Sequence, residues 1–155
     1  MISVQTKDFN IENEYRRLRI DAGDAGAIVT FTGLVREIYD DNEHKGEKVK
    51  TLFLEHYPEM TENSLQSIVD AASVKWEVLA VRVIHRIGAL KPQDQIVFVG
   101  VASMHRQDAF DATSFIMDFL KSEAPFWKKQ STESHSKWIE VRTSDTDAVK
   151  SWGRT

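Results

Sequence analysis

The chain has 155 residues, of which 41% are hydrophobic and 28% are charged, and its formal net charge is −4. This composition is typical of a globular protein, and the length predicts one domain over residues 1–155. A net acidic chain is a poor candidate for general nucleic-acid binding, because phosphate contacts require a basic surface. The absence of cysteine excludes disulfides, zinc–thiolate sites, cysteine nucleophiles and any persulfide on this chain.

Several other classes of protein lack support in the sequence. The longest apolar run, residues 96–102, is far shorter than the ~18 residues of a membrane span, and the polar N-terminal stretch does not resemble a secretory signal. We therefore expect a cytoplasmic protein. The five histidines lack HxH, HxxxH and HExxH spacing, which predicts no metal site. The sequence contains no GxSxG, GxGxxG or P-loop motif, so it does not indicate a standard hydrolase or a nucleotide-binding fold. No resident cofactor is expected.

The N-terminal part predicts an edge strand, a helix and a longer strand. Residues 2–6 form the short strand, and residues 11–20 form the helix, with Tyr15 and Leu18 turned inward. The β-branched residues of the segment 26–36 predict the longer strand. One face of that strand is expected to carry Ala27, Val29, Phe31 and Val35.

The next segment predicts a loop, a strand and a helix. Gly33 indicates a bulge or a close backbone contact at the end of the preceding strand. Residues 37–48 are polar and charged, which is typical of a mobile hairpin loop over a site, and residues 49–57 form the returning strand. Pro58 can open a helix at its first position. The core-facing stripe of that helix is expected to be Leu65, Ile68, Val69, Ala72 and Trp76.

Two strands and the longest helix follow. Residues 78–87 and 95–103 predict the strands, joined by the turn-rich segment 88–94, and the second strand is apolar on both faces, which favours a central position. Ser103 is a plausible N-cap for the helix, which must end before Pro125. Its polar face is expected to hold Gln107, Asp111, Ser114, Asp118 and Lys121, and its core face Ala109, Ala112, Ile116, Phe119 and Leu120.

The C-terminal part predicts a hairpin and a short helix. Residues 126–131 and 137–143 form the hairpin, and residues 144–152 form the helix, capped by Ser144. Strands therefore occur in adjacent pairs rather than singly between helices. This order predicts an α+β fold with a mixed, mainly antiparallel sheet and two main helices packed on it.

Cations are unusually placed around the longest helix. His105 and Arg106 occupy its first turn, where a positive charge is unfavourable by roughly 0.3–1 kcal/mol. A bound anion would offset this cost, because free N–H groups and an arginine form a phosphate site. The alternative is solvation of both cations, with Ser103 capping the helix and Asp108 and Asp111 balancing the charge, and this segment alone slightly favours it.

Lysines flank the end of the same helix. Lys121 precedes Pro125, and Lys128 and Lys129 follow it. If Lys121 and Lys128 approach each other in a partly apolar setting, repulsion favours a neutral amine that can act as a nucleophile or as a general acid and base. Each lysine alone is more often a surface charge, and Lys121 could pair with Asp118.

Five blocks, spread over nearly the whole chain, share their order and residues with one known family. They are FTGLVR at 31–36, LEHYPEMTE at 54–62, VIHRIG at 83–88, SMHRQDAF at 103–110 and IMDFLKSEAPFWKK at 116–129. Together they resemble the large, catalytic subunit of molybdopterin synthase, the MoaE family. The resemblance implies an α/β-hammerhead-type fold and transfer of two sulfurs to cyclic pyranopterin monophosphate, which forms the dithiolene of molybdopterin.

The resemblance also implies partners. In this family the sulfur arrives on the C-terminal Gly-Gly thiocarboxylate of a small ubiquitin-like subunit, whose tail inserts into the large subunit. Two large subunits form a homodimer with one small subunit at each end, giving a heterotetramer. A sulfur donor on a separate chain agrees with the absence of cysteine here.

The family's functional residues can be assigned to positions of this sequence. Lys121 and Lys128 match the catalytic lysines, in acid/base or transient covalent roles, and His105 and Arg106 match the pair that holds the pterin phosphate. Arg36 closes the FTGLVR block and is expected to face substrate, although Leu34 stands where several relatives have lysine. The remaining substrate-binding positions implied by the family are Leu34, Val35, Met117, Lys129, Gln130 and Arg142.

Two other functions are weighed against this one. A non-catalytic adaptor would bind a ubiquitin-like tail without chemistry, and its binding would survive the loss of both lysines. An enzyme for another phosphorylated metabolite would bind an anion without sulfur transfer. The presence of Lys121 and Lys128 argues against the adaptor.

Overall fold

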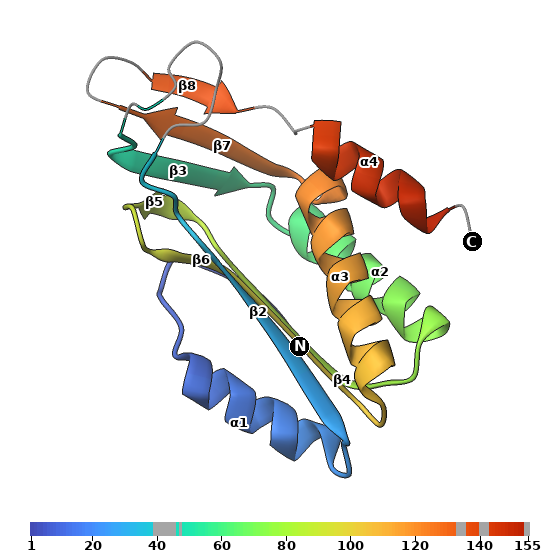
Figure 1. The fold of residues 1–155 in the computed structure, drawn as a ribbon. Helices are drawn as coiled ribbons and strands as arrows, with labels where there is room; N and C mark the ends of the chain where they lie inside the picture. Colours follow the sequence, from blue (N-terminus) through green and yellow to red (C-terminus); the bar gives the residue numbers. More distant parts are fainter. Residues whose placement is uncertain (39–45, 47, 133–135, 140–142, 154–155) are drawn as a thin grey trace.

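Two four-stranded sheets organise the protein in this computed structural model, which describes residues 1–38, 46, 48–132, 136–139 and 143–153. Their strands are β1 Ile2–Gln5, β2 Ala27–Leu34, β3 Thr51–His56, β4 Val78–Arg86, β5 Gly88–Leu90, β6 Gln95–Ser103, β7 Phe126–Ser131 and β8 Ser136–Ile139. The strand order is β1-β4-β6-β2 in the first sheet and β5-β3-β7-β8 in the second (Figure 1). The β1–β4 pair is parallel and the other strand pairs described are antiparallel. The α+β fold predicted from the sequence is confirmed, with its strands divided between two sheets.

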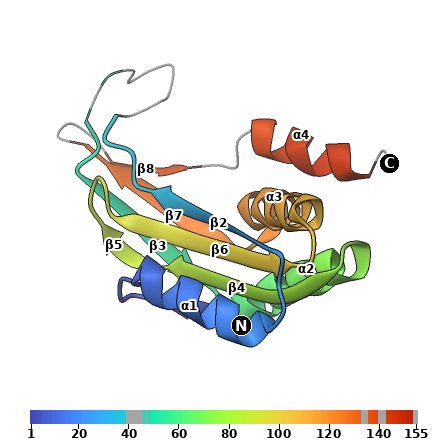
Figure 2. The same cartoon turned by 60° about the horizontal axis from the view of Figure 1, so that its bottom comes forward.

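Helices cover both faces of the first sheet (Figure 2). They are α1 Ile11–Ala22, α2 Met60–Lys75, α3 Arg106–Glu123 and α4 Thr143–Trp152. The helices α2 and α3 pack together on one face, α1 packs on the other, and α4 lies against α3. The aromatic ring of Trp152 in α4 contacts the rings of Trp76 and Phe115, which attaches the last helix to the main core.

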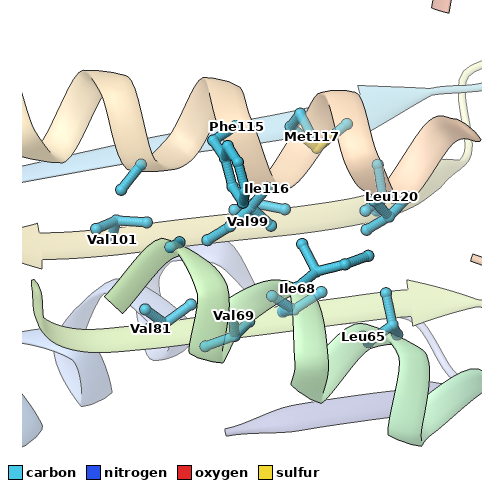
Figure 3. Packing of buried hydrophobic residues seen from close by; sticks show 14 residues of the cluster. Leu65, Ile68, Val69, Val81, Val99, Val101, Phe115, Ile116, Met117 and Leu120 are labelled. Atoms are coloured by element: carbon cyan, nitrogen blue, oxygen red, sulfur yellow. The ribbon is translucent and has the colours of Figure 1, made fainter. Parts of the chain in front are cut away.

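The alternation of side chains along β6 builds two cores at once. Val97, Val99 and Val101 point toward α2 and α3, where they meet Leu65, Ile68 and Ile116 among other residues (Figure 3). Phe98 points the opposite way, into a smaller cluster with Leu18 of α1. β6 is therefore buried on both faces between β4 and β2, and the predicted central position is confirmed. The predicted stripe on α2 is also confirmed, with Trp76 at its partly buried end.

A third cluster joins the two sheets. Val35, Leu52, Leu54 and Leu90 are buried together, with Ile139 of β8 packed against them. Gly33 lies just before this cluster, at a register shift in the β2–β6 pair, and a Cβ there would stand 2.7 Å from the Val97 side chain. The bulge or close contact predicted at Gly33 is confirmed.

One residue predicted to face inward is on the surface. Tyr15 of α1 is 42% exposed. On α1 the inward position next to Tyr15 is taken by Glu14, whose carboxylate forms a buried ion pair with Arg82 of β4. A hydrophobic pattern does not predict that an acidic residue such as Glu14 faces inward. Its burial depends on the ion pair with Arg82, which is 68 residues away in the sequence.

Three predicted helix starts are wrong by one or more residues. α2 begins at Met60, after Glu59 in a left-handed conformation (φ 67°), so Pro58 precedes the helix. Ser103 remains in β6, where its hydroxyl donates to the Glu77 carbonyl, and His105 occupies the N-cap position of α3. α4 begins at Thr143, so position 144 lies inside it.

The sequence also predicts two connections between strands. The segment 88–94 contains a short strand, β5, that pairs with β3, in addition to the predicted turn. The loop predicted at 37–48 lies mostly outside the described residues, apart from an isolated bridge between Ile38 and Lys48 at its base. The predicted hairpin of β7 and β8 is confirmed over its described part.

Candidate active site

Lys121 and Lys128 lie on either side of the junction between α3 and β7. The helix ends because Ala124 takes extended geometry (φ −69°, ψ 129°) before Pro125, which has no N–H to donate. Lys121 is exposed in the last turn of α3, where a cation suits the negative end of the helix dipole. Lys128 is the third residue of β7 and is half-buried. Two amines therefore flank a short connection.

Thr61 ties this junction to the start of α2 and the end of β3. Its side chain is fully buried. The hydroxyl donates to the Pro125 carbonyl oxygen at 3.1 Å and accepts a hydrogen bond from the Tyr57 N–H, also at 3.1 Å. The buried hydroxyl thus both donates and accepts a hydrogen bond, so it has no unpaired polar atom. These bonds join the start of α2, the end of β3 and the α3–β7 junction.

Strand alternation separates the two lysines of β7. Lys128 pairs with buried Leu54 and therefore faces the interior between the sheets, as does Gln130. Lys129 pairs with Phe53 and points to the opposite, outer face, where its ammonium lies 5.8 Å from the centre of the Trp138 ring. Of the two residues expected to continue the wall after Lys128, only Gln130 shares its face.

His85 of β4 packs against the first residue of β7. Its ring stacks on Phe126 with centroids 3.7 Å apart, and its Nδ1 lies 2.8 Å from the Arg86 carbonyl oxygen. Burial lowers the pKa of His85 to about 3. The hydrogen bond to Arg86 opposes this shift, and positive charge at Lys128 and His56 reinforces it. His85 is therefore a buried, hydrogen-bonded core histidine, and it is neutral at physiological pH.

A second histidine, His56, lies at the end of β3. It pairs with Phe126 across the β3–β7 ladder, so its side chain is on the same face as Lys128. Its Nε2 is 3.5 Å from the Glu62 carboxylate in the first turn of α2. The other Glu62 oxygen is buried and makes no hydrogen bond to any described residue. An acid–base pair therefore stands beside the junction that carries the lysines.

The expected site residues at the end of β2 alternate between the surface and the core. Leu34 is 47% exposed, Val35 is buried in the third cluster, and Arg36 is exposed directly after the strand. Met117 is one turn before Lys121 on α3 and is buried in the main core. The side chains of Val35 and Met117 thus support the neighbouring positions from within the core.

His105 and Arg106 lie at the far end of α3 from Lys121. The helix has 18 residues, and Lys121 is separated from Arg106 by about 22 Å along its axis at 1.5 Å per residue. His105 and Arg106 are both exposed. Asp108, in the same turn, accepts a hydrogen bond from the Glu77 N–H, which places one carboxylate near these cations. One chain therefore does not bring the two pairs into a single site.

Comparison with known proteins decides the family. A model described as "MoaE protein" matches residues 4–123. The chain belongs to the MoaE family. The molybdopterin synthase catalytic subunit of Escherichia coli K12 is 50% identical over 151 residues, 97% of each chain. A MoaE structure from Burkholderia ambifaria MC40-6 has a TM-score of 0.83 and 40% identity, covering 100% of this chain and 99% of that one. A complex of subunits 1 and 2 of molybdopterin-converting factor from Helicobacter pylori 26695 shares the fold (TM-score 0.72, 16% identity, 91% of each chain).

Sequence reasoning did not select every polar residue of this region in the MoaE chain. His56 and Glu62 both lie in the block 54–62, and neither was expected to act. Their six-residue separation spans a strand end, a turn and a helix start, so no simple periodicity joins them. Arg142 lies outside the described residues.

Other features of the MoaE chain lie away from this region. Among the described residues, no group of three or more histidine, aspartate or glutamate side chains is arranged to hold a metal ion. No helix of the described part is long and apolar enough to cross a membrane. An open depression of about 450 Å³ lies between α1 and the start of β2 and contains none of the expected site residues; it is lined by Tyr15, Arg16, Arg19, Ile20, Gly23, Ala25, Gly26, Ala27 and Ile28.

Proposed function

We propose that this MoaE protein is the catalytic subunit of a molybdopterin synthase, a sulfurtransferase that converts cyclic pyranopterin monophosphate to the molybdopterin dithiolene. The relative that carries this name is 50% identical over 97% of both chains. The observation that carries the proposal is the position of Lys121 and Lys128 on either side of a junction fixed by Thr61. Both lysines belong to the block that resembles the family's catalytic segment.

The proposed reaction requires positively charged or basic groups next to the carbonyl of the small subunit's tail. A thiocarboxylate sulfur attacks a side-chain carbon of the pterin while the C–O bond at that carbon breaks, and the oxygen leaves with the electron pair of that bond and takes up a proton. The product is a thioester between the small subunit's tail and the substrate. Water then cleaves the acyl C–S bond, which leaves a carboxylate on the tail and a thiol on the pterin. The oxyanion that forms at the tail carbonyl is stabilised by an ammonium group held nearby, and a neutral amine can instead accept a proton or attack that carbonyl. Lys121 and Lys128 supply these groups in our proposal.

The partner is a small ubiquitin-like subunit in this proposal. The Helicobacter pylori structure of the same fold is a complex of subunits 1 and 2 of molybdopterin-converting factor, which supports a two-subunit assembly. The extended Gly-Gly tail of such a partner can enter a narrow site because glycine has no side chain. The absence of cysteine fits a donor on another chain.

A second copy of the chain completes the substrate site. β2 is an edge strand of eight residues without charge or proline, a sequence that favours pairing with another strand. Its first residue, Ala27, pairs with Ser103 beside His105, and its last residues lead to Arg36. Antiparallel pairing of two copies about a two-fold axis brings opposite ends of β2 together. His105 and Arg106 of one chain then serve the lysine end of the other.

Conversion of cyclic pyranopterin monophosphate by this protein, mixed with a thiocarboxylated small subunit, tests the function. Wild type should form dithiolene, and Lys121→Ala and Lys128→Ala should lose that activity while they still bind the partner. Binding without product in wild type would instead indicate an adaptor. Binding of the phosphorylated pterin without sulfur transfer would indicate an enzyme with another substrate.

A further inference from the structure

His56 lies within reach of Lys128 on the inner face of the second sheet. In the β3–β7 ladder His56 pairs with Phe126, and Lys128 is two residues further along β7 on the same face. Such diagonal neighbours have Cβ atoms about 7–8 Å apart or less, which the long lysine side chain can span. Both groups act electrostatically on the buried ring of His85. The two side chains therefore share one corner of the protein.

Glu62 orients the ring of His56. Its Oε1 lies 3.5 Å from Nε2, and the His56 side chain is only 16% exposed. A carboxylate next to Nε2 favours a proton on that nitrogen, which leaves the lone pair on Nδ1. No described residue hydrogen-bonds Nδ1. The charged or titratable groups around His56 are Glu62 from α2, His85 from β4 and Lys128 from β7.

His85 cannot take the same role. Its Nδ1 faces the Arg86 carbonyl oxygen, its ring is covered by Phe126, and its burial keeps it neutral to about pH 3. A group that exchanges protons during turnover must change its charge near neutral pH, as an accessible histidine does. Of the two histidines next to Lys128, only His56 keeps part of its side chain exposed.

We propose that His56, held by Glu62, accepts the proton that Lys128 releases during each sulfur transfer and later returns it. In the forward step an N–H bond of the lysine ammonium breaks, its electron pair stays on Nζ, and the proton forms an N–H bond at Nδ1 of His56, directly or through one water. The reverse step restores both groups. This assignment rests on the proposed function, and within it His56 is a proton-transfer residue and Glu62 a positioning residue.

The test is the pH dependence of kcat for His56→Gln in the sulfur-transfer assay with the small subunit. Loss of a general acid–base group lowers kcat by about 10²-fold or more, and the acid limb of the wild-type profile should disappear. His56→Gly should recover part of its activity when imidazole is added, which a purely structural defect would not allow. Thermal unfolding and partner binding should stay close to wild type.

Glu62→Gln provides a second variant that keeps the histidine. Because the carboxylate orients the ring of His56, its removal should lower kcat while KM for the small subunit stays close to wild type. The matched control is Glu59→Gln, which removes the same charge from an exposed position three residues earlier and should leave kcat unchanged.

The outcomes separate this proposal from the proposed function. An active wild type, with His56→Gln within about threefold of its kcat and an intact acid limb, overturns the proton-transfer role alone. An unchanged kcat in Glu62→Gln overturns the positioning role. A wild type that binds the small subunit but forms no product overturns the proposed function, and the role of His56 with it.

Discussion

The imidazole of His85 lies almost flat on the ring of Phe126, with centroids 3.7 Å apart and planes inclined by 18°. This contact joins β4 of the first sheet to the first residue of β7 in the second sheet. The strand that carries Lys128 therefore starts from a fixed point on the main core. Because the stack requires an uncharged ring in a buried place, it also makes the stability of the fold depend on pH.

Stability should fall as pH falls from about 6.5 toward about 3. The pKa of His85 is lowered from 6.5 to about 3 by burial. Between these values the unfolded chain binds a proton that the folded chain does not, so the free energy of unfolding decreases by about 1.4 kcal/mol per pH unit at most. Above pH 6.5 the ring is neutral in both the folded and the unfolded chain, so His85 no longer changes the free energy of unfolding with pH. Urea unfolding at pH 7 and pH 5 measures the difference.

His85→Phe is the control for this dependence. It keeps an aromatic ring against Phe126 but cannot be protonated, so its unfolding free energy should change less between pH 7 and pH 5 than that of wild type. The other titratable groups are common to both proteins and cancel in the comparison. Equal slopes in the two proteins would show that His85 is not the group responsible.

Thr61→Val should destabilise the fold and reduce activity together. The Thr61 hydroxyl is buried and bonds both Pro125 and Tyr57, so valine leaves the Pro125 carbonyl and the Tyr57 N–H, both part-buried, without their partner. The expected loss is about 1–3 kcal/mol by urea unfolding. Ser67→Ala in the same helix removes an exposed hydroxyl and should change stability by at most about 0.5 kcal/mol. A Thr61→Val protein as stable as Ser67→Ala would contradict this account.

Lys129→Ala should retain most of the activity that Lys128→Ala loses. The two lysines are adjacent in sequence but lie on opposite faces of β7, and Lys129 contacts Trp138 on the outer face. Loss of a group that acts on the reacting atoms lowers kcat by about 10²-fold or more, whereas Lys129→Ala should stay within about threefold of wild type. The pair serves as its own control, since each variant removes one positive charge. Equal losses would place Lys129 at the reacting atoms as well.

Much of the framework follows from local signals in the sequence. The apolar residues of β6 predict its central position, the stripe on α2 predicts its core face, and Pro125 predicts where α3 ends. These features depend on neighbours a few residues apart, which the period of a strand or helix reveals. The division of strands between two sheets is different, because it depends on pairings such as β3 with β5 and β7 that no local pattern specifies.

The candidate site shows the same limit. Sequence blocks identify Lys121 and Lys128, but the face on which Lys129 lies follows only from the register of β7 against β3. The inward direction of Glu14 follows only from Arg82, 68 residues away. The separation of His105 from Lys121, by contrast, does follow from the sequence, because the two residues fall at the start and in the last turn of one predicted helix.

Mixed dimers test whether two chains share each site. Lys128→Ala and Arg106→Ala should each be inactive alone, because Arg106 lies about 22 Å along α3 from the lysine end of its own chain. In a heterodimer of the two variants, one site combines both substitutions and the other combines intact Lys128 from one chain with intact Arg106 from the other. Random mixing of equal amounts should therefore restore about one quarter of the wild-type activity.

The measurement requires subunit exchange, followed by the sulfur-transfer assay at fixed total protein. The matched control mixes Lys128→Ala with Lys121→Ala, which lie at the same end of the chain. Since both lysines serve the same chain's site, neither site of that heterodimer is complete, and activity should stay at the level of the separate variants. Recovery in the control mixture as well would mean that Lys121 and Lys128 act in different chains. No recovery in either mixture, with exchange verified by differently tagged chains, would place Arg106 and Lys128 in the same chain's site.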